Sequence, residues 1–184
     1  ITMNINGKKA IVFGGTSGIG LSATNMLSEK GAIVIAVSRN PEKLKNLPKN
    51  VTTKKLDITN KDSVEKFFQE MGEYDILVNS ATGGARAVGP FLSMDLDGYK
   101  ASFDKLWGYT NVVRYGTQFL KDDGNIVLVS GSPARKCRPG QIAISSVGGA
   151  VEAFARGIAP EIAPKRINIC LLYTSPSPRD TFES

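Results

Sequence analysis

The sequence predicts an α/β fold in which a doubly wound parallel sheet lies between two layers of helices. Strand-like and helix-like segments alternate along the 184 residues. The strand-like segments are rich in Ile and Val without polar alternation, which is typical of parallel strands buried on both faces. Right-handed crossovers then give the strand order 3-2-1-4-5, followed by the beginning of a sixth strand. We therefore expect a three-layer α/β/α sandwich that is cut short after the start of the sixth strand.

The strands are expected where short apolar runs end in turn residues. The first run, KAIVF, leads directly into glycines, and the helical pattern LSATNMLSEKG follows them. By the same criterion, strands are predicted at 9–13, 33–38, 52–56, 76–79, 126–130 and 166–169.

Helices are expected where the pattern changes to the helical period. They are predicted at 19–30, 41–46, 61–71, 99–120 and 145–163. Thr59 or Asn60 can cap the third of these, because each precedes a periodic run with an acid in its first turn. We find no internal repeat and no linker, so residues 1–169 are interpreted as one domain.

Composition excludes several classes of function. The chain has no histidine, which excludes a Ser-His-Asp hydrolase and His-ligated metal sites, and we expect no metal. Its net charge of +6 is scattered rather than gathered with aromatic residues, which argues against nucleic-acid binding. No apolar stretch approaches the ~20 residues of a membrane span, and no signal peptide precedes the first strand. With only two cysteines, a reducing cytoplasm is the expected location.

The last fifteen residues have a different character. The segment from Cys170 to Asp180, CLLYTSPSPRD, matches one reading frame of a transposase adapter used in sequencing libraries. The alternative is an ordinary tail rich in Ser and Pro. We expect residues 170–184 to be a non-native tail, so that the natural chain breaks off near Ile169.

The glycine-rich turn GGTSGIG predicts a dinucleotide site. Gly14, Gly18 and Gly20 fall where a strand turns sharply into a helix. Without Cβ atoms these positions let a pyrophosphate approach the main chain, and the helix N-terminus favours its negative charge. A tight turn without a ligand is the alternative, but the position between the first strand and the first helix favours nucleotide binding.

Further motifs in the same order resemble the short-chain dehydrogenase/reductase family over nearly all of residues 3–169. They are Asp57-Ile58 after the third strand, DILVNSA around Asn79, IVLVSGS ending at Ser132, and AVEAF in the last helix. The resemblance implies a Rossmann fold, hydride transfer between a nicotinamide and a carbonyl or alcohol, a small-molecule substrate, and a homo-oligomer. It also implies cofactor contacts from Gly14, Thr16, Ser17, Gly18, Ile19, Gly20, Asp57, Ile58, Asn79, Ser80 and Ala81.

The pair of residues that carries the family's chemistry is missing. The positions that match its Tyr and Lys hold Ile144 and Gly148, which leaves an apolar wall and a gap. The resemblance instead points to Ser132, with Ser130 in reserve, and to Lys105, which matches the family's helical Asn. A buried amine with a depressed pKa can supply a proton. The alternatives are a surface lysine at 105 and, for the whole protein, a catalytically inactive NADP-binding sensor or scaffold.

The second strand indicates which cofactor is preferred. It ends at Ser38-Arg39, where sites for NAD carry an acid that bonds both ribose hydroxyls. Ser38 and Arg39 can instead bind a 2′-phosphate, which favours NADP(H) over NAD(H). The alternative is that Arg39 is an ordinary surface charge. The basic loop with Arg135, Lys136 and Arg138 is either solvated or in contact with an acidic substrate.

Overall fold

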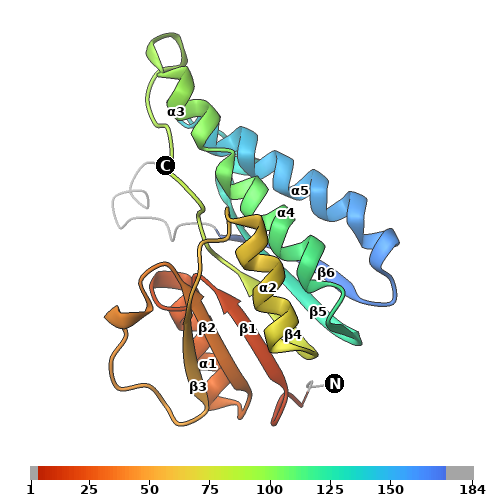
Figure 1. Cartoon of the computed structure of the whole chain (residues 1–184). Coiled ribbons are helices and arrows are strands. Elements are labelled where there is room, and N and C mark those ends of the chain that lie inside the picture. Colours follow the sequence, from red (N-terminus) through yellow and green to blue (C-terminus); the bar gives the residue numbers. More distant parts are fainter. Residues whose placement is uncertain (1–3, 173–184) are drawn as a thin grey trace, which may run out of the picture.

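Six parallel strands form one twisted sheet in the order β3-β2-β1-β4-β5-β6 (Figure 1). The computed structural model describes residues 4–172. This order confirms the predicted doubly wound sheet with its sixth strand. The strands are β1 (Lys9–Phe13), β2 (Ile33–Ser38), β3 (Val51–Lys55), β4 (Tyr74–Asn79), β5 (Leu120–Gly131) and β6 (Arg166–Leu172).

Helices cover both faces of the sheet. In Figure 1, α2, α4 and α5 lie in front of the strands and α1 lies behind them. The short α3 stands at the end of the molecule and leads into α4. The helices are α1 (Gly18–Glu29), α2 (Lys61–Met71), α3 (Leu96–Ala101), α4 (Asp104–Gly116) and α5 (Ile142–Ile162), with 3₁₀ turns η1 (Pro41–Lys43), η2 (Phe91–Ser93) and η3 (Ser132–Ala134).

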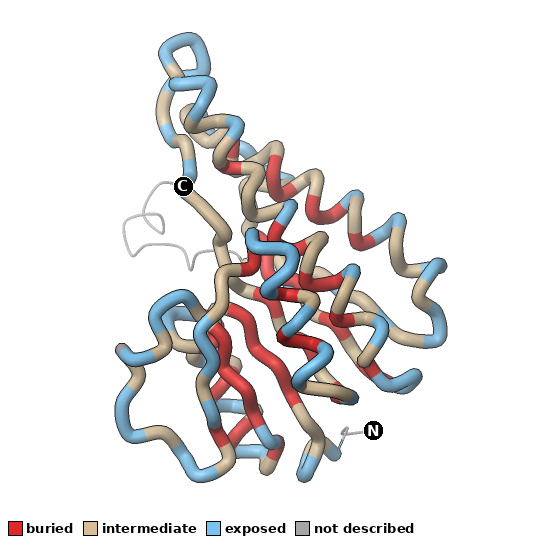
Figure 2. The backbone as a smooth tube through the Cα atoms, in the orientation of Figure 1, coloured by how far each residue is buried: buried red, intermediate tan, exposed pale blue. Residues whose placement is uncertain are grey.

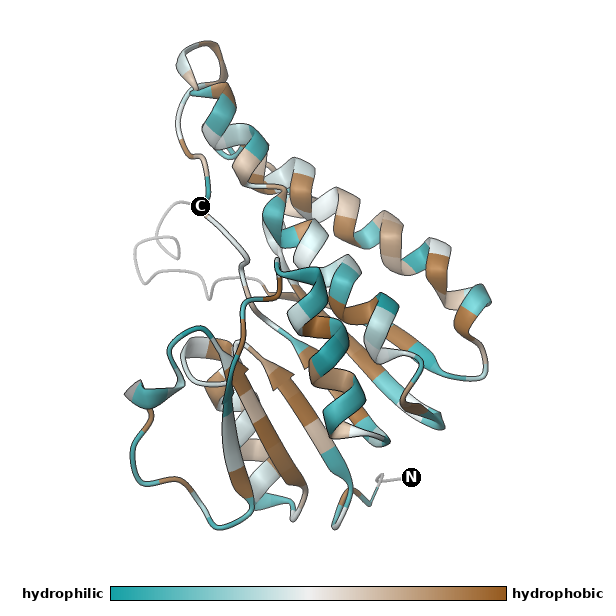
Figure 3. Cartoon of the chain, viewed as in Figure 1, coloured by the Kyte–Doolittle hydropathy of each residue, from teal (hydrophilic) through white to brown (hydrophobic). Residues whose placement is uncertain are grey.

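The central strands are buried on both faces, as the unbroken apolar runs predict. In β1, Ile11 and Phe13 belong to the core cluster under α2, α4 and α5, whereas Ala10 and Val12 belong to the cluster under α1. All four are fully buried. Figure 2 shows this burial along the middle of the sheet, and Figure 3 shows the matching apolar colouring of the strands. Burial on both faces fixes the sheet between its two helical layers.

The predicted helix over 99–120 is wrong in its extent. The chain forms two helices there, and the second ends at Gly116. A Cβ at Gly116 would lie 2.6 Å from Phe68 Cζ, and Tyr74 donates a hydrogen bond from its hydroxyl to the Gly116 carbonyl at 2.9 Å. These contacts come from α2 and β4, so the sequence near Gly116 does not show them. Strand β5 then begins at Leu120 rather than at residue 126.

Two smaller differences concern helix ends. The predicted helix over 41–46 is only the turn η1. Of the two candidate caps for α2, Asn60 is the one that acts, since its side chain accepts a hydrogen bond from Ser63 N at 3.0 Å. Thr59 instead donates to Asp57.

Strand β6 extends three residues past its predicted end at Ile169. Cys170, Leu171 and Leu172 pair with Val129, Ser130 and Gly131 of β5. The segment continues the strand because it supplies a further pairing partner for the long β5. The rest of the expected tail, residues 173–184, lies outside the described residues.

Helix α5 is longer and more apolar than the sequence expectation allowed. Within the described residues it is the one helix whose length and composition would suffice to cross a membrane. A core helix passes the same test, and Val147, Val151 and Ala155 of α5 are buried in the core under the sheet. The helix also carries Glu152 and Arg156.

Candidate functional site

The glycine turn has the backbone geometry that the sequence predicts. Gly14 and Gly18 have positive φ angles of 75° and 49°. A Cβ on Gly20 would lie 2.0 Å from the Gly14 carbonyl oxygen, so only glycine lets α1 pack this closely on the turn. A Cβ on Gly18 would meet nothing within 4 Å, so this backbone faces open space. The turn, the bare backbone and the close helix packing are the three features that a dinucleotide cradle needs.

A cavity of about 390 Å³ opens over this turn at the carboxyl ends of the strands. It is bounded by the glycine turn, the ends of β2 and β3 and the segment after β4. Twelve of the thirteen predicted cofactor residues line it: Gly14, Thr16, Ser17, Gly18, Ile19, Gly20, Ser38, Arg39, Asp57, Ile58, Ser80 and Ala81. The structure thus brings these residues together around one space that is suited to a nucleotide.

Asn79 is the predicted cofactor residue that does not line this cavity. It is fully buried at the end of β4, between β1 and β5. Its Oδ1 accepts a hydrogen bond from Ala81 N at 3.2 Å, and its Nδ2 has no protein partner within residues 4–172. Asn79 therefore shapes the turn after β4 from beneath the cavity.

Polar side chains line the part of this cavity beside the ends of β2 and β3. Thr16 donates a hydrogen bond to Ser38 Oγ at 2.8 Å, which leaves the Ser38 proton free for a ligand. Arg39 is exposed beside them. Asp57 is the acid of this lining, and its Oδ1 is held by the Thr59 backbone and hydroxyl at 2.9 and 2.8 Å.

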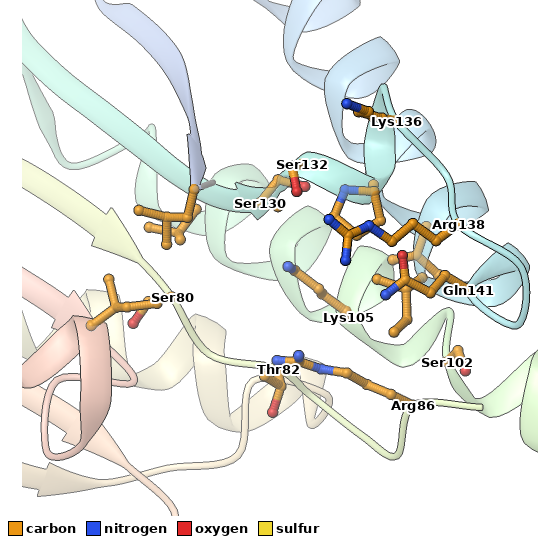
Figure 4. A pocket seen from close by; sticks show the side chains of 18 of the residues that line it. Ser80, Thr82, Arg86, Ser102, Lys105, Ser130, Ser132, Lys136, Arg138 and Gln141 are labelled. Atoms are coloured by element: carbon orange, nitrogen blue, oxygen red, sulfur yellow. The ribbon is translucent and has the colours of Figure 1, made fainter. Parts of the chain in front are cut away.

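A second cavity of about 450 Å³ adjoins the first and contains both predicted catalytic residues, Ser132 and Lys105. The two cavities share Ile19, Ser80, Thr82 and Arg86. In Figure 4, Lys105 reaches into the space from α4, and Ser130 of β5 and Ser132 of η3 lie above it in this view. A molecule bound in the second cavity would therefore lie next to a molecule bound in the first, at the residues that the two cavities share.

Lys105 lies in an environment that weakens its hold on a proton. Burial, and then the nearby charge of Arg86, lower its pKa from 10.5 to about 8. Its ammonium stands 5.3 Å from the centre of the Tyr109 ring, which is a cation–π contact. Tyr109 is itself fixed, because its buried hydroxyl donates to the Val129 carbonyl at 2.7 Å. Lys105 is therefore not the surface lysine of the alternative interpretation.

Gly148 lines the second cavity, but the expected gap leaves no room for a side chain there. A Cβ there would lie 2.7 Å from the Ala134 Cβ and 3.3 Å from Ser130 Oγ. Turn η3, which carries Ala134, packs directly on α5 and occupies the place that a side chain at 148 would need. Ile144 lines the second cavity, as expected for an apolar wall.

Sequence reasoning missed Arg86, Thr82 and Gln141, which also line the second cavity. Arg86 and Thr82 follow β4 in a segment with several glycines, and Gln141 precedes α5. The position after a parallel strand is the one available signal for the first two, since ligand-binding residues gather at such strand ends.

Comparison with known proteins agrees with this geometry. The chain matches the family model described as short chain dehydrogenase over residues 8–181. It is 27% identical over 174 residues to L-xylulose reductase of Mesocricetus auratus, covering 91% of this chain and 70% of that protein. It is 28% identical over 174 residues to carbonyl reductase (NADPH) 2 of Sus scrofa, with the same coverage of 91% and 70%.

Solved structures give the same picture. A small-chain dehydrogenase in complex with NADPH superposes with a TM-score of 0.77 at 30% identity, covering 89% of this chain and 69% of that one. A short chain dehydrogenase from Burkholderia cenocepacia in complex with NADP gives a TM-score of 0.84 at 28% identity, covering 92% and 73%. Each of the two structures covers about nine tenths of this chain.

Proposed function

Since the chain belongs to the short chain dehydrogenase family, we propose that it is an NADP(H)-dependent oxidoreductase in which Lys105 replaces the missing tyrosine as proton donor. The single observation that carries this proposal is that Lys105 and Ser132 line the same cavity, which adjoins the glycine cradle. Membership of the family itself supports an oxidoreductase that binds a nicotinamide cofactor. The preference for NADP(H) and the role of Lys105 are proposals.

The cradle fits a dinucleotide. Gly18 offers bare backbone to a pyrophosphate, and Gly20 keeps α1 close enough for its N-terminus to face the same anion. Ser38 and Arg39 would hold a 2′-phosphate, with Thr16 orienting the Ser38 hydroxyl. Asp57 retains Oδ2 for the adenine amino group, in the role that family resemblance assigns. When bound, the nicotinamide supplies the hydride.

The chain's own residues would prepare the substrate oxygen. Ser132 would donate a hydrogen bond to a carbonyl oxygen, and Lys105 would pass it a proton from Nζ as negative charge develops there. A pKa of about 8 suits this task, because the amine is protonated at neutral pH yet gives up its proton more easily than an ordinary lysine. The apolar wall formed by Ile144 excludes water from one side.

The test compares the wild-type chain with Lys105→Met, using Lys66→Met as the matched control on the exposed face of α2. NADPH binding is measured by its fluorescence, and turnover is measured with a panel of carbonyl compounds. We expect Lys105→Met to bind NADPH normally but to lose at least about 100-fold in kcat/KM, since general acid catalysis commonly contributes about 10²–10⁴-fold. The wild-type kcat/KM for reduction should fall as the pH rises above about 8.

Two outcomes would reject this function. Reduction that survives Lys105→Met unchanged would require another proton donor. Tight NADPH binding without turnover over the whole panel would favour the non-catalytic sensor or scaffold.

The proposal includes a homo-oligomer, as members of this family commonly form. Trp107 on α4 is 62% exposed, and an apolar side chain of this size is a candidate for a subunit contact. Light scattering on the purified chain, with Trp107→Glu for comparison, checks this expectation. A monomer at micromolar concentration would contradict it.

A further inference from the structure

The second cavity has a strongly unbalanced charge. Four cationic side chains line it, Arg86, Lys105, Lys136 and Arg138, and its lining contains no Asp or Glu. None of the four forms an ion pair within residues 4–172. Figure 4 shows Arg86, Lys105 and Arg138 around the same space, with Gln141 beside them. Like charges held this close repel one another, so an anion in the cavity would relieve the repulsion.

The loop that carries two of these cations is held in place. Arg135, the third basic residue of the loop, bonds from Nε and Nη2 to the carboxylate of Glu152 on α5 at 3.2–3.3 Å. Glu152 is only 8% exposed, so this pair anchors the loop rather than binding a ligand. The loop is further fixed by a bond from Lys136 N to the Ser132 carbonyl at 2.8 Å and from Gln141 N to the Arg138 carbonyl at 3.1 Å. Lys136 and Arg138 are therefore presented at the cavity with their charges uncompensated.

The four cationic residues differ in which of the two cavities they line. Arg86 lines both cavities and is available to a nucleotide as well. Lys105, Lys136 and Arg138 line only the second cavity. The remaining lining includes an apolar wall of Val129, Ile144 and Val147. The second cavity thus combines an exposed cationic rim, a partly buried amine and an apolar wall.

We propose that the substrate is a carboxylic acid with a carbonyl group, an oxo acid that is reduced to the hydroxy acid, with its carboxylate bound by Arg138 and Lys136. This inference rests on the proposed function and adds its substrate class. A guanidinium binds a carboxylate with two parallel N–H donors, which suits Arg138 for the anchor. The reduction adds a hydride to the carbonyl carbon as the C=O π bond breaks, and the oxygen takes a proton from Lys105 Nζ. The two electrons come from the reduced nicotinamide, and Lys105 regains its proton from water.

Binding is tested with phenylglyoxylate, an aromatic oxo acid, against its uncharged methyl ester. Isothermal titration calorimetry is carried out on the chain saturated with NADP⁺ and on the chain alone. We expect phenylglyoxylate to bind up to about fivefold more tightly than the ester for each ion pair that it forms, since a partly exposed ion pair contributes up to about 1 kcal/mol. Arg138→Gln should remove most of this difference without changing NADP⁺ affinity. Arg114→Gln, an exposed arginine on the outer face of α4, is the matched control and should change neither.

The outcomes separate this inference from the proposed function. Equal binding of acid and ester, or competition between phenylglyoxylate and NADP⁺, would overturn the inference even where NADP⁺ binds. Failure of the wild-type chain to bind NADP⁺ would reject the proposed function, and the cofactor-free titration would still decide whether the cavity prefers the carboxylate. If Arg138→Gln lowers the melting temperature, Arg138→Lys replaces it, and the preference for the acid should still fall because lysine cannot offer two parallel N–H donors to the carboxylate.

Discussion

Lys105 shows how a single partly buried charge links activity to stability. Its pKa falls from 10.5 to about 8 because burial, with help from Arg86, penalises the charged form. The unfolded chain keeps the ordinary value, so between about 8 and 10.5 it binds more protons than the folded chain does. Stability must therefore rise with pH over this range, and the full penalty applies below it. The fold tolerates a charge that the proposed reaction needs.

We accordingly expect Lys105→Met to be more stable than wild type at pH 7, by about 1–3 kcal/mol in the free energy of unfolding. The gain should shrink as the pH rises from about 8 towards 10.5, because folded wild type loses the charge on Lys105 above about 8 and no longer suffers the cost of burying it. Urea unfolding at several pH values measures it, with Lys66→Met as the exposed control. A variant less stable than wild type at pH 7 would show that the cation–π contact with Tyr109 outweighs the cost of burial.

Arg39 decides the cofactor preference in our proposal. Loss of a charge-assisted bond to phosphate typically costs about 1.5–3 kcal/mol, or roughly 10- to 150-fold in affinity. Because Arg39 is exposed, we expect Arg39→Ala to weaken NADPH binding by an amount near the lower end of this range, while NADH binding changes little. Fluorescence titration with both nucleotides checks the prediction. Equal losses for both would mean that Arg39 does not read the 2′-phosphate.

At the scale of elements, the packing of η3 on α5 fixes the shape of the catalytic end. Ala134 in η3 lies where a side chain on Gly148 would have to go. A Cβ on the neighbouring Gly149 would meet nothing within 4 Å. Two adjacent glycines of one helix therefore differ only in what faces them, which makes them a matched pair.

We expect Gly149→Ala to raise the free energy of unfolding by about 0.5–1 kcal/mol, since alanine is the better helix former. Gly148→Ala should instead lower it by about 1–3 kcal/mol, because η3 must shift away from the added Cβ. Urea unfolding of both variants gives the comparison. Equal increases in the free energy of unfolding for both variants would mean that η3 moves away from the added Cβ without an energetic cost.

The same contact changes what is expected of restoring the family's missing pair. Ile144 lines the cavity, but the Cβ of a lysine at 148 would collide with Ala134. Ile144→Tyr with Gly148→Lys should therefore destabilise the chain and fail to raise carbonyl reduction. Steady-state kinetics of the double variant beside Ile144→Tyr alone measures this, and a tenfold gain from the double variant would contradict it.

For the molecule as a whole, Asp75 joins strands far apart in the sequence at the end of the sheet opposite the cavities. It is 5% exposed and accepts hydrogen bonds from Lys8 Nζ at 3.1 Å and Lys9 N at 2.9 Å, while Lys121 Nζ lies 3.2 Å away. Burial alone raises the pKa of Asp75, but these three partners outweigh it and hold the pKa below 3.8. The ionised carboxylate thus stabilises the junction of β1, β4 and β5.

Asp75→Asn should cost about 1–3 kcal/mol of stability at pH 7, because charge-assisted hydrogen bonds are lost. The contribution is fully present above the ordinary pKa and disappears as the pH falls through the lowered one, so the difference between variant and wild type should close in acid. Asp62→Asn is the control, since its side chain is 89% exposed. A difference that persists unchanged to pH 2 would show that the charge is not the cause.

The sequence alone determined the strand–turn–helix units and the residues of the nucleotide cradle. These follow from local features, namely apolar runs for buried strands and glycines where the backbone needs positive φ or close approach, and they recur at strand ends that a parallel sheet brings together. The strand order and twelve of the thirteen cofactor residues around one cavity agree with this.

Only the tertiary structure decided the character of the second cavity. The charge of Arg86 helps to lower the pKa of Lys105, and Ala134 fills the space beside Gly148. Glu152 pairs with Arg135 and leaves Arg138 uncompensated. Each of these facts depends on which side chains from distant segments come within a few ångströms of one another. Burial and neighbouring charge set a lysine's pKa and a loop's electrostatics, and neither is written in the local sequence.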